Sequence, residues 1–241
     1  MDSNQISQHI SKQFNTELEN IREMVLTMGG IVEQQLSDAL DALLDGDTEL
    51  ADKVIKEDKR VNDLEMQIDQ ECTTILAKRQ PAASDLRLIL TIIKSIADLE
   101  RIGDEARKVA KMAIHLAELQ TFAGNKHQFA AVLHLGSHVR TMLHGALDAF
   151  ARMNAESAIT TALEERIIDS EYNALLRQLS TYMMEDPRSI SAVLDVIWAA
   201  RALERIGDHA RNVCEYIVYL VHGKDVRHTK LEDIAEQIKL G

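Results

Sequence analysis

The spacing of apolar residues along the chain predicts long helices. Between residues 88 and 113, apolar residues recur every three or four positions, as they do on the buried face of an amphipathic helix. The same spacing recurs between residues 192 and 217. Each segment also carries one glycine, Gly103 or Gly207, and a glycine inside a helix costs about 1 kcal/mol relative to alanine. We therefore expect each helix to pack closely on a neighbour, or to form a site, at its glycine.

The two segments belong to a longer internal repeat. A shift of 107 residues aligns DALDALLDGDTELA (38–51) with GALDAFARMNAESA (145–158). A shift of 104 residues aligns LERIGDEAR (99–107) with LERIGDHAR (203–211). A difference of three residues in one connection, near the two prolines, accounts for the change in shift. We interpret the chain as an internal duplication.

Each half of the duplication predicts three helices. The expected helices span residues 4–44 and 47–79 in the first half, with a third that starts after Pro81, and residues 126–153, 154–185 and 188–222 in the second half. Asp47, Ser84 and Asn154 are the expected N-cap residues. The sequence thus predicts an all-α fold of two tandem, pseudo-symmetric three-helix bundles. The expected domains are residues 1–122 and 123–222, followed by a polar C-terminal tail over residues 223–241.

Composition and net charge favour helices and argue against nucleic-acid binding. The low aromatic content of 4% and the two prolines favour helices over strands. The net charge of −12 repels nucleic-acid phosphates, so nucleic acid is not an expected partner. No charge-free apolar run approaches the roughly 18 residues of a membrane span, and no signal peptide is evident at the N-terminus. We expect a cytoplasmic protein that meets membranes only through partners, with Cys72 and Cys214 as buried free thiols.

Next to the buried face of each of these two helices runs a second row of residues at helical spacing. This row begins with apolar residues and continues into carboxylates. The row reaches Glu100 and Asp104 in the first half, and Glu204, Asp208 and Asn212 in the second. Residues four apart on a helix have Cβ atoms about 5–6 Å apart, so the like charges repel each other. The preceding helix of each half offers further oxygen donors, which are Asp58 and Asn62 in the first half and Glu165 and Asp169 in the second.

The spacing leaves two interpretations of these carboxylates open. Neighbouring arginines could neutralise them, as on an ordinary charged helix surface. A hard divalent cation could do the same, because such ions take several oxygen ligands from neighbouring helices. Lys108 stands at the first-half position of Asn212, where it could fill the cation position or weaken metal binding. The second half is therefore the better-equipped metal site.

Other motifs are weaker. His134 and His138 have a spacing that can ligate zinc, but no Glu, Cys or third His joins them in the sequence. The aligned residues of the first half are Thr27 and Ile31, so we interpret the pair as surface histidines. A phosphate-binding glycine loop, a nucleophile elbow and a Cys-x-x-Cys motif are all absent from the sequence.

The doubled LERIGD segments, RQPAASDLR (79–87) and LERIGDHARNVCEYIVY (203–219) resemble the PhoU family of bacterial regulators of phosphate uptake, and the resemblance extends over residues 14–219. It implies two three-helix bundles with multinuclear metal sites. The implied ligands are Glu100, Asp104, Glu204 and Asp208, with Asp58, Asn62, Glu165, Asp169 and Asn212 as companions. The family is associated with iron, zinc, manganese or magnesium. All-oxygen ligands favour manganese, magnesium or iron, with zinc possible.

The resemblance also implies a role. PhoU proteins resemble adaptors more than enzymes, so the resemblance implies that the chain is not an enzyme. Such adaptors link the ATPase subunit of the phosphate ABC transporter to the phosphate-sensing histidine kinase, and restrain both uptake and the phosphate-starvation response. Homodimers are common among them. Two alternatives stay open: a di-metal hydrolase acting on phosphate esters, and a metal-free helical scaffold.

Overall fold

The computed structural model describes residues 3–119, 126–227 and 229, which contain helices and no strand. The helices are α1 (Ser3–Asp45), α2 (Thr48–Arg79), α3 (Ala83–Glu118), α4 (Lys126–Arg152), α5 (Ala155–Leu163), α6 (Glu165–Glu185), the 3-10 helix η1 (Pro187–Ser189) and α7 (Ile190–His222). The all-α prediction is confirmed, and the helices of the second half follow the order of those in the first.

The observed helix starts confirm two of the three predicted N-cap residues. Asp47 caps α2 by accepting hydrogen bonds from the backbone N–H groups of Glu49 and Leu50, at 3.0 and 2.9 Å. Asn154 caps α5 in the same way, by accepting from the N–H of Ser157 at 3.0 Å. The prediction for Ser84 is wrong, because the N-cap residue of α3 is Ala82, whose side chain makes no capping hydrogen bond.

The predicted single helix over residues 154–185 is also wrong. It is divided at Glu164 into α5 and α6. The N–H of Glu164 bonds to the carbonyl of Thr161 at 3.1 Å, three residues back, so the turn is tighter than in an α-helix. The Thr160 hydroxyl donates to the Glu156 carbonyl at 3.0 Å, a contact that bends helices. Because of this break, Glu165 lies in the first turn of α6.

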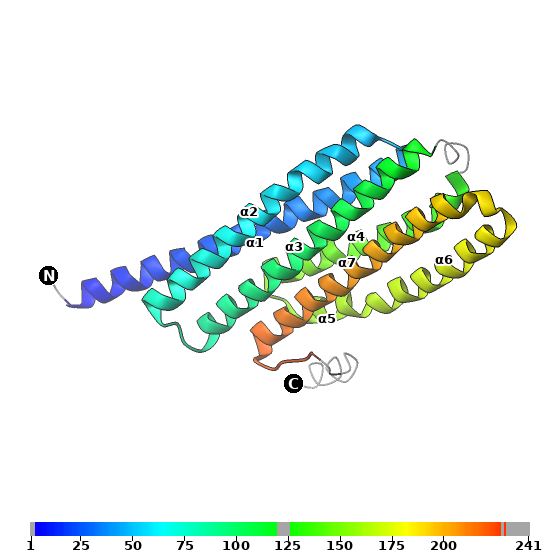
Figure 1. Ribbon diagram of the computed structural model, residues 1–241. Helices are drawn as coiled ribbons and strands as arrows, with labels where there is room; N and C mark the ends of the chain where they lie inside the picture. Colours follow the sequence, from blue (N-terminus) through cyan, green and yellow to red (C-terminus); the bar gives the residue numbers. More distant parts are fainter. Residues whose placement is uncertain (1–2, 120–125, 228, 230–241) are drawn as a thin grey trace.

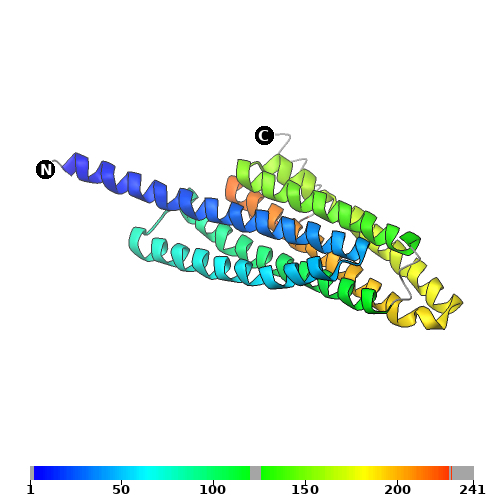
Figure 2. The same cartoon turned by 90° about the horizontal axis from the view of Figure 1, so that it is seen from above.

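The two halves lie side by side and share one core. Helices α1, α3, α4 and α7 pack around a common centre, with α2 on the first-half side and α5 and α6 on the second-half side (Figure 1). The buried apolar residues of both halves form a single cluster. The molecule is elongated, and the N-terminal part of α1 projects beyond the other helices (Figure 2). Among the described residues, no helix is long and apolar enough to cross a membrane.

The predicted division into domains stays a prediction. Its boundary after residue 122 falls within residues 120–125, outside the described part of the chain. Most of the predicted tail, residues 228 and 230–241, also lies outside it.

Candidate metal site at the repeated carboxylates

The motif glycines bring α3 and α7 close to the middle helix of their own half. A Cβ atom on Gly103 would lie 3.5 Å from side-chain atoms of Asp58 and Val61 on α2. A Cβ atom on Gly207 would lie 3.2 Å from the Ile168 side chain on α6. The close approach expected from the glycines is therefore confirmed. It also brings the motif carboxylates next to the acidic residues of the middle helix.

In the first half, four carboxylates act on one another. Burial raises the pKa of Glu100, and the charges of Asp104, Glu65 and Asp58 raise it further. Burial also raises the pKa of Asp58, whose side chain is only 6% exposed. Clustered carboxylates of this kind favour either a proton or a bound cation.

Arg107 supplies one cation in the first half. Its Nε lies 3.2 Å from Asp58 Oδ2, and its Nη2 pairs with Asp104. The second oxygen of Asp58 and the side-chain oxygen of Asn62 are buried without a hydrogen-bond partner. Because buried polar atoms are nearly always paired, this half still has two oxygens available to a ligand.

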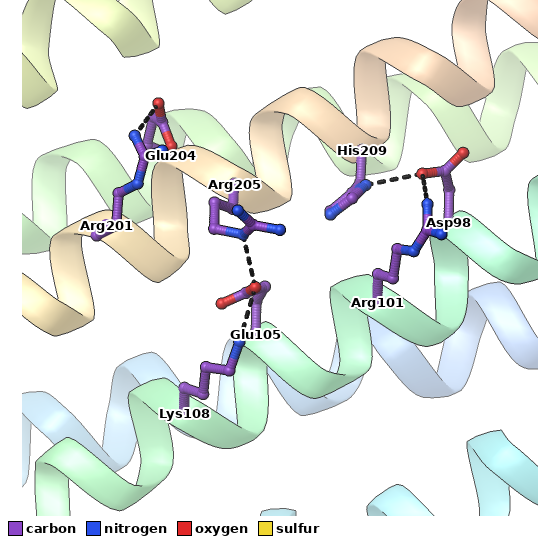
Figure 3. A network of polar contacts seen from close by, with 8 residues as sticks. All are labelled: Asp98, Arg101, Glu105, Lys108, Arg201, Glu204, Arg205 and His209. Carbon is purple, nitrogen blue, oxygen red and sulfur yellow. Dashed lines mark hydrogen bonds and ion pairs between the residues drawn. The ribbon is translucent and has the colours of Figure 1, made fainter.

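The second half repeats the arrangement with a more deeply buried glutamate. Burial raises the pKa of Glu204, and the charges of Asp208 and Asp169 raise it further. Burial also raises the pKa of Asp208, again with a contribution from Asp169. Glu204 Oε1 accepts a hydrogen bond from Arg201 Nη1 at 2.6 Å (Figure 3). Glu204 Oε2 is buried without a partner.

Arginine occupies an equivalent place in both halves. Arg211 Nη1 donates to Glu165 Oε1 at 2.9 Å and its Nε donates to Glu215 at 3.0 Å. This pair matches Arg107 and Asp58 under the repeat alignment. The final arginine of each motif thus pairs with a carboxylate at the aligned position of the middle helix, Asp58 or Glu165. Arginine therefore neutralises part of the negative charge at Asp58 and Glu165. This agrees with the interpretation in which neighbouring arginines neutralise the carboxylates.

Asn212 and Lys108 face the interface between the halves. Asn212 Nδ2 donates to Asp98 Oδ1 at 3.2 Å, and Lys108 Nζ donates to Glu105 Oε1 at 2.9 Å (Figure 3). Lys108 is therefore held by Glu105, and the donating amide of Asn212 is directed at α3. Neither contact joins its residue to the motif carboxylates.

The same interface contains a polar network that the sequence did not reveal. Arg205 Nε donates to Glu105 Oε1 at 2.8 Å, and His209 Nδ1 lies 2.7 Å from Asp98 Oδ1 (Figure 3). Asp98 and Glu105 are only 1% and 4% exposed. The LERIGD motif therefore makes two kinds of contact. Its glutamate and aspartate face the middle helix of their own half. The residues directly after them make contacts between α3 and α7.

Two further residues near the first site were missed. Glu65 lies seven residues after Asp58 on α2, a spacing that shares one helix face, so it could have been found. Gln35 is fully buried on α1 with neither side-chain polar atom hydrogen-bonded. Its Oε1 would lie 3.2 Å from a Cβ atom on Gly103. No spacing rule indicates a polar residue on that apolar face of α1.

His134 and His138 lie at the surface as expected, but the expectation that no glutamate joins them is wrong. Glu171 on α6 joins His134 and His138, and the ligand atoms of these three residues lie within 4.8 Å of one another. Among the residues that the structure describes, no other group of three His, Cys, Asp or Glu residues meets this distance. The motif carboxylates Glu100, Asp104, Glu204 and Asp208 therefore belong to no group of three ligand atoms this close together.

Comparison with known proteins identifies relatives of this chain. A model of the PhoU domain matches twice, over residues 25–113 and 132–217. The phosphate-specific transport system accessory protein PhoU homolog of Pseudomonas aeruginosa is 52% identical over 239 residues, covering 99% of this chain and 98% of that protein. The phosphate-specific transport system accessory protein PhoU of Escherichia coli is 51% identical over 230 residues, covering 95% and 93%.

Solved structures that resemble this chain come from the same family. The crystal structure of PhoU from Pseudomonas aeruginosa has a TM-score of 0.83 and 55% identity, covering 88% of this chain and all of that one. That of the phosphate transport system regulatory protein PhoU from Streptococcus pneumoniae has a TM-score of 0.80 and 33% identity, covering 88% and 99%. These names describe accessory and regulatory proteins, in agreement with the expectation that the chain is not an enzyme. Two matched repeats, high identity and a shared fold together establish that the chain belongs to the PhoU family.

Proposed function

We propose that this chain is a cytoplasmic, metal-binding adaptor that restrains phosphate uptake and the phosphate-starvation response. In this role it links the ATPase subunit of the phosphate ABC transporter to the phosphate-sensing histidine kinase. The observation that carries the proposal is the identity of about half of all residues, over nearly the whole chain, to accessory proteins of the phosphate-specific transport system. The regulatory part of the role follows the name of the Streptococcus pneumoniae structure.

The residues of the two motif sites fit a hard cation. Their donors are oxygens, and three of these are buried without hydrogen bonds, on Asp58, Asn62 and Glu204. Glu100 and Asp104 would hold the metal in the first half with Asp58 and Asn62. Glu204 and Asp208 would hold it in the second half with Asp169, and Glu165 and Asn212 would be outer members. A bound manganese, magnesium or iron ion would neutralise the mutual repulsion of these carboxylates.

An exposed apolar stripe on α7 offers a surface for a partner protein. Ile190, Leu194 and Trp198 are 41%, 44% and 62% exposed and follow one another at four-residue spacing, so they share one face of the helix. Arg201 and Glu204 lie on the following turns of α7. Exposed apolar patches next to polar groups mark interaction sites, and tryptophan is a frequent anchor in them. We propose that this stripe contacts a partner close to the second metal site.

Two measurements test the adaptor role. In a strain that lacks the chain, a phosphate-starvation reporter should stay active at high phosphate, and the wild-type gene should restore repression. A reporter that stays repressed at high phosphate in the deletion strain would contradict the role. The tagged chain should also capture the transporter ATPase and the kinase from solubilised membranes. Trp198→Ala should weaken this capture, whereas Met66→Ala on α2, a site of matching 61% exposure, should leave it unchanged.

The proposal includes a homodimer, contact with the membrane only through partners, and a cytoplasmic location, as the family resemblance implies. Light scattering on the purified chain should give twice the mass of 27.1 kDa. Fractionation should recover the chain with the cytoplasm when the transporter is deleted. A monomeric mass, or membrane association that persists without the transporter and the kinase, would contradict these parts of the proposal.

A further inference from the structure

We propose that His134, His138 and Glu171 form a zinc site on the outer face of the second half, between α4 and α6. His134 Nδ1 lies 3.2 Å from Glu171 Oε1, and His138 Nδ1 lies 2.9 Å from the same oxygen. In a tetrahedral zinc site with ligands at about 2.0–2.1 Å, neighbouring ligand atoms are about 3.3 Å apart. The three side chains therefore need only small rotations to surround an ion.

The two histidines are positioned by helix geometry. They are four residues apart on α4, so both imidazoles leave the same face of the helix. Their ring centroids are 4.5 Å apart, and the ring planes are inclined at 61°. Glu171 comes from a different helix, α6, so the set joins two helices. Two imidazoles and one carboxylate are a common zinc ligand set, which leaves a fourth position open for water or another ligand.

Both histidines lie within ion-pair distance of Glu171, but two atoms of the set make no hydrogen bond. Although His138 Nδ1 and Glu171 Oε1 are 2.9 Å apart, His138 Nδ1 is buried and makes no hydrogen bond. Glu171 Oε2 is likewise buried without a hydrogen-bond partner. Two polar atoms that lie close together without a hydrogen bond between them suit ligands of one shared ion. Buried polar atoms are otherwise nearly always paired.

The site is separate from the motif carboxylates and belongs to the second half alone. Glu171 follows Asp169 by two residues, so the two side chains are rotated by about 200° around α6 and point in different directions. Under the repeat alignment, the first half has Thr27, Ile31 and Leu64 at these positions. The imidazole nitrogens also distinguish the site chemically, because they favour zinc over the hard cations that all-oxygen sites take.

Zinc titration of the full, chelator-treated chain tests the inference. Calorimetry should show one zinc site that His138→Ala and Glu171→Gln each weaken by at least about tenfold. The matched control is His144→Ala, because His144 also lies on α4 and its Nδ1 also approaches a carboxylate, Glu33 at 2.8 Å, but it has no second histidine. The control should bind zinc as the wild type does. Pulsed electron paramagnetic resonance with Cu²⁺ as probe should detect two imidazole nitrogens in the wild type.

Thermal unfolding gives an independent result, since an ion shared by α4 and α6 stabilises the folded chain. Zinc should raise the Tm of the wild type and of His144→Ala, but not that of His138→Ala, whose metal-free Tm shows whether it folds. Zinc binding that is unchanged in both His138→Ala and Glu171→Gln, or that is equally lost in His144→Ala, would overturn the inference. So would the absence of nitrogen ligands in the wild type.

Discussion

Gly29 on α1 packs directly against Leu147 on α4, at the crossing of the two halves. The repeat alignment places Gly136 and Leu40 at the equivalent positions, and these two residues also pack against each other. The contact between α1 and α4 therefore obeys the same pseudo-symmetry as the sequence. It shows that the duplicated halves pack through duplicated surfaces, with a small residue on each helix facing a large one on the other.

Gly29→Ala should leave the chain less stable than Gly30→Ala by about 1 kcal/mol or more, because its Cβ atom would overlap the buried Leu147 side chain. Gly30 is the matched control, since nothing lies within 4 Å of a Cβ atom there. Gly30→Ala should stabilise the chain by up to about 1 kcal/mol through helix propensity. Urea unfolding of both variants measures the difference. Equal effects at the two glycines would contradict close packing at Gly29.

Glu105→Gln should lower the free energy of unfolding by about 1–2 kcal/mol. The substitution removes the buried charge that both Arg205 and Lys108 contact at the α3–α7 interface. The control is Asp148→Asn, which breaks an exposed pair with Arg152, four residues away on α4. This change should cost no more than about 0.5 kcal/mol. If denaturant unfolding shows the two variants to be equally stable, the network of Figure 3 does not hold the halves together.

The ion pair between Glu17 and Arg79 should make stability depend on pH in the acid range. Arg79 donates to both carboxylate oxygens of Glu17, at 2.9 and 2.7 Å, and its hydrogen bonds lower the pKa of Glu17 below the ordinary value of 4.5. The lowered pKa means that the contribution is complete above about pH 4.5 and is lost as the pH falls further.

Glu17→Gln should therefore cost on the order of 0.5 kcal/mol at pH 7 and nothing at pH values below the lowered pKa. Chemical unfolding of wild type and variant across this range, at constant ionic strength, measures the difference. A difference that stays constant, or that grows as the pH falls, would show that the ion pair is not its cause.

The two cysteines should be unreactive in the folded protein. Cys72 and Cys214 are free, and both are fully buried. Burial raises the pKa of Cys72 to about 12 and raises that of Cys214 as well, so neither forms a thiolate at neutral pH. Ellman's reagent should detect two thiols in guanidinium chloride and none without it over the same time. Rapid reaction of one thiol in buffer would place that cysteine at the surface.

Much of the fold could be predicted from the sequence because local signals and the repeat agreed. The apolar spacing gave the long helices, and Asp47 and Asn154 gave two of their starts. The break at Glu164 was not predictable in this way, because no proline or glycine marks it. The tight turn in which the Glu164 N–H bonds to the Thr161 carbonyl has no counterpart in α2, which is continuous.

The candidate site was predictable only in part. Residues on one helix, such as Glu204 and Asp208, could be grouped by spacing alone. Contacts between helices could not, because they depend on helix rotation and packing distance. Asn212 therefore turned out to contact Asp98, and Glu171 turned out to complete a set with His134 and His138, although neither relationship leaves a periodic trace in the sequence.

Metal content tests the central claim, that the repeated carboxylates hold a cation, most directly. Elemental analysis of protein purified without chelator should find manganese, magnesium or iron in the wild type. An Asp104→Ala, Asp208→Ala double variant should lose most of it, and Asp148→Ala, which removes a carboxylate from α4 outside both sites, should keep it. Equal amounts of these metals in the wild type and the double variant, with both proteins folded, would contradict the account.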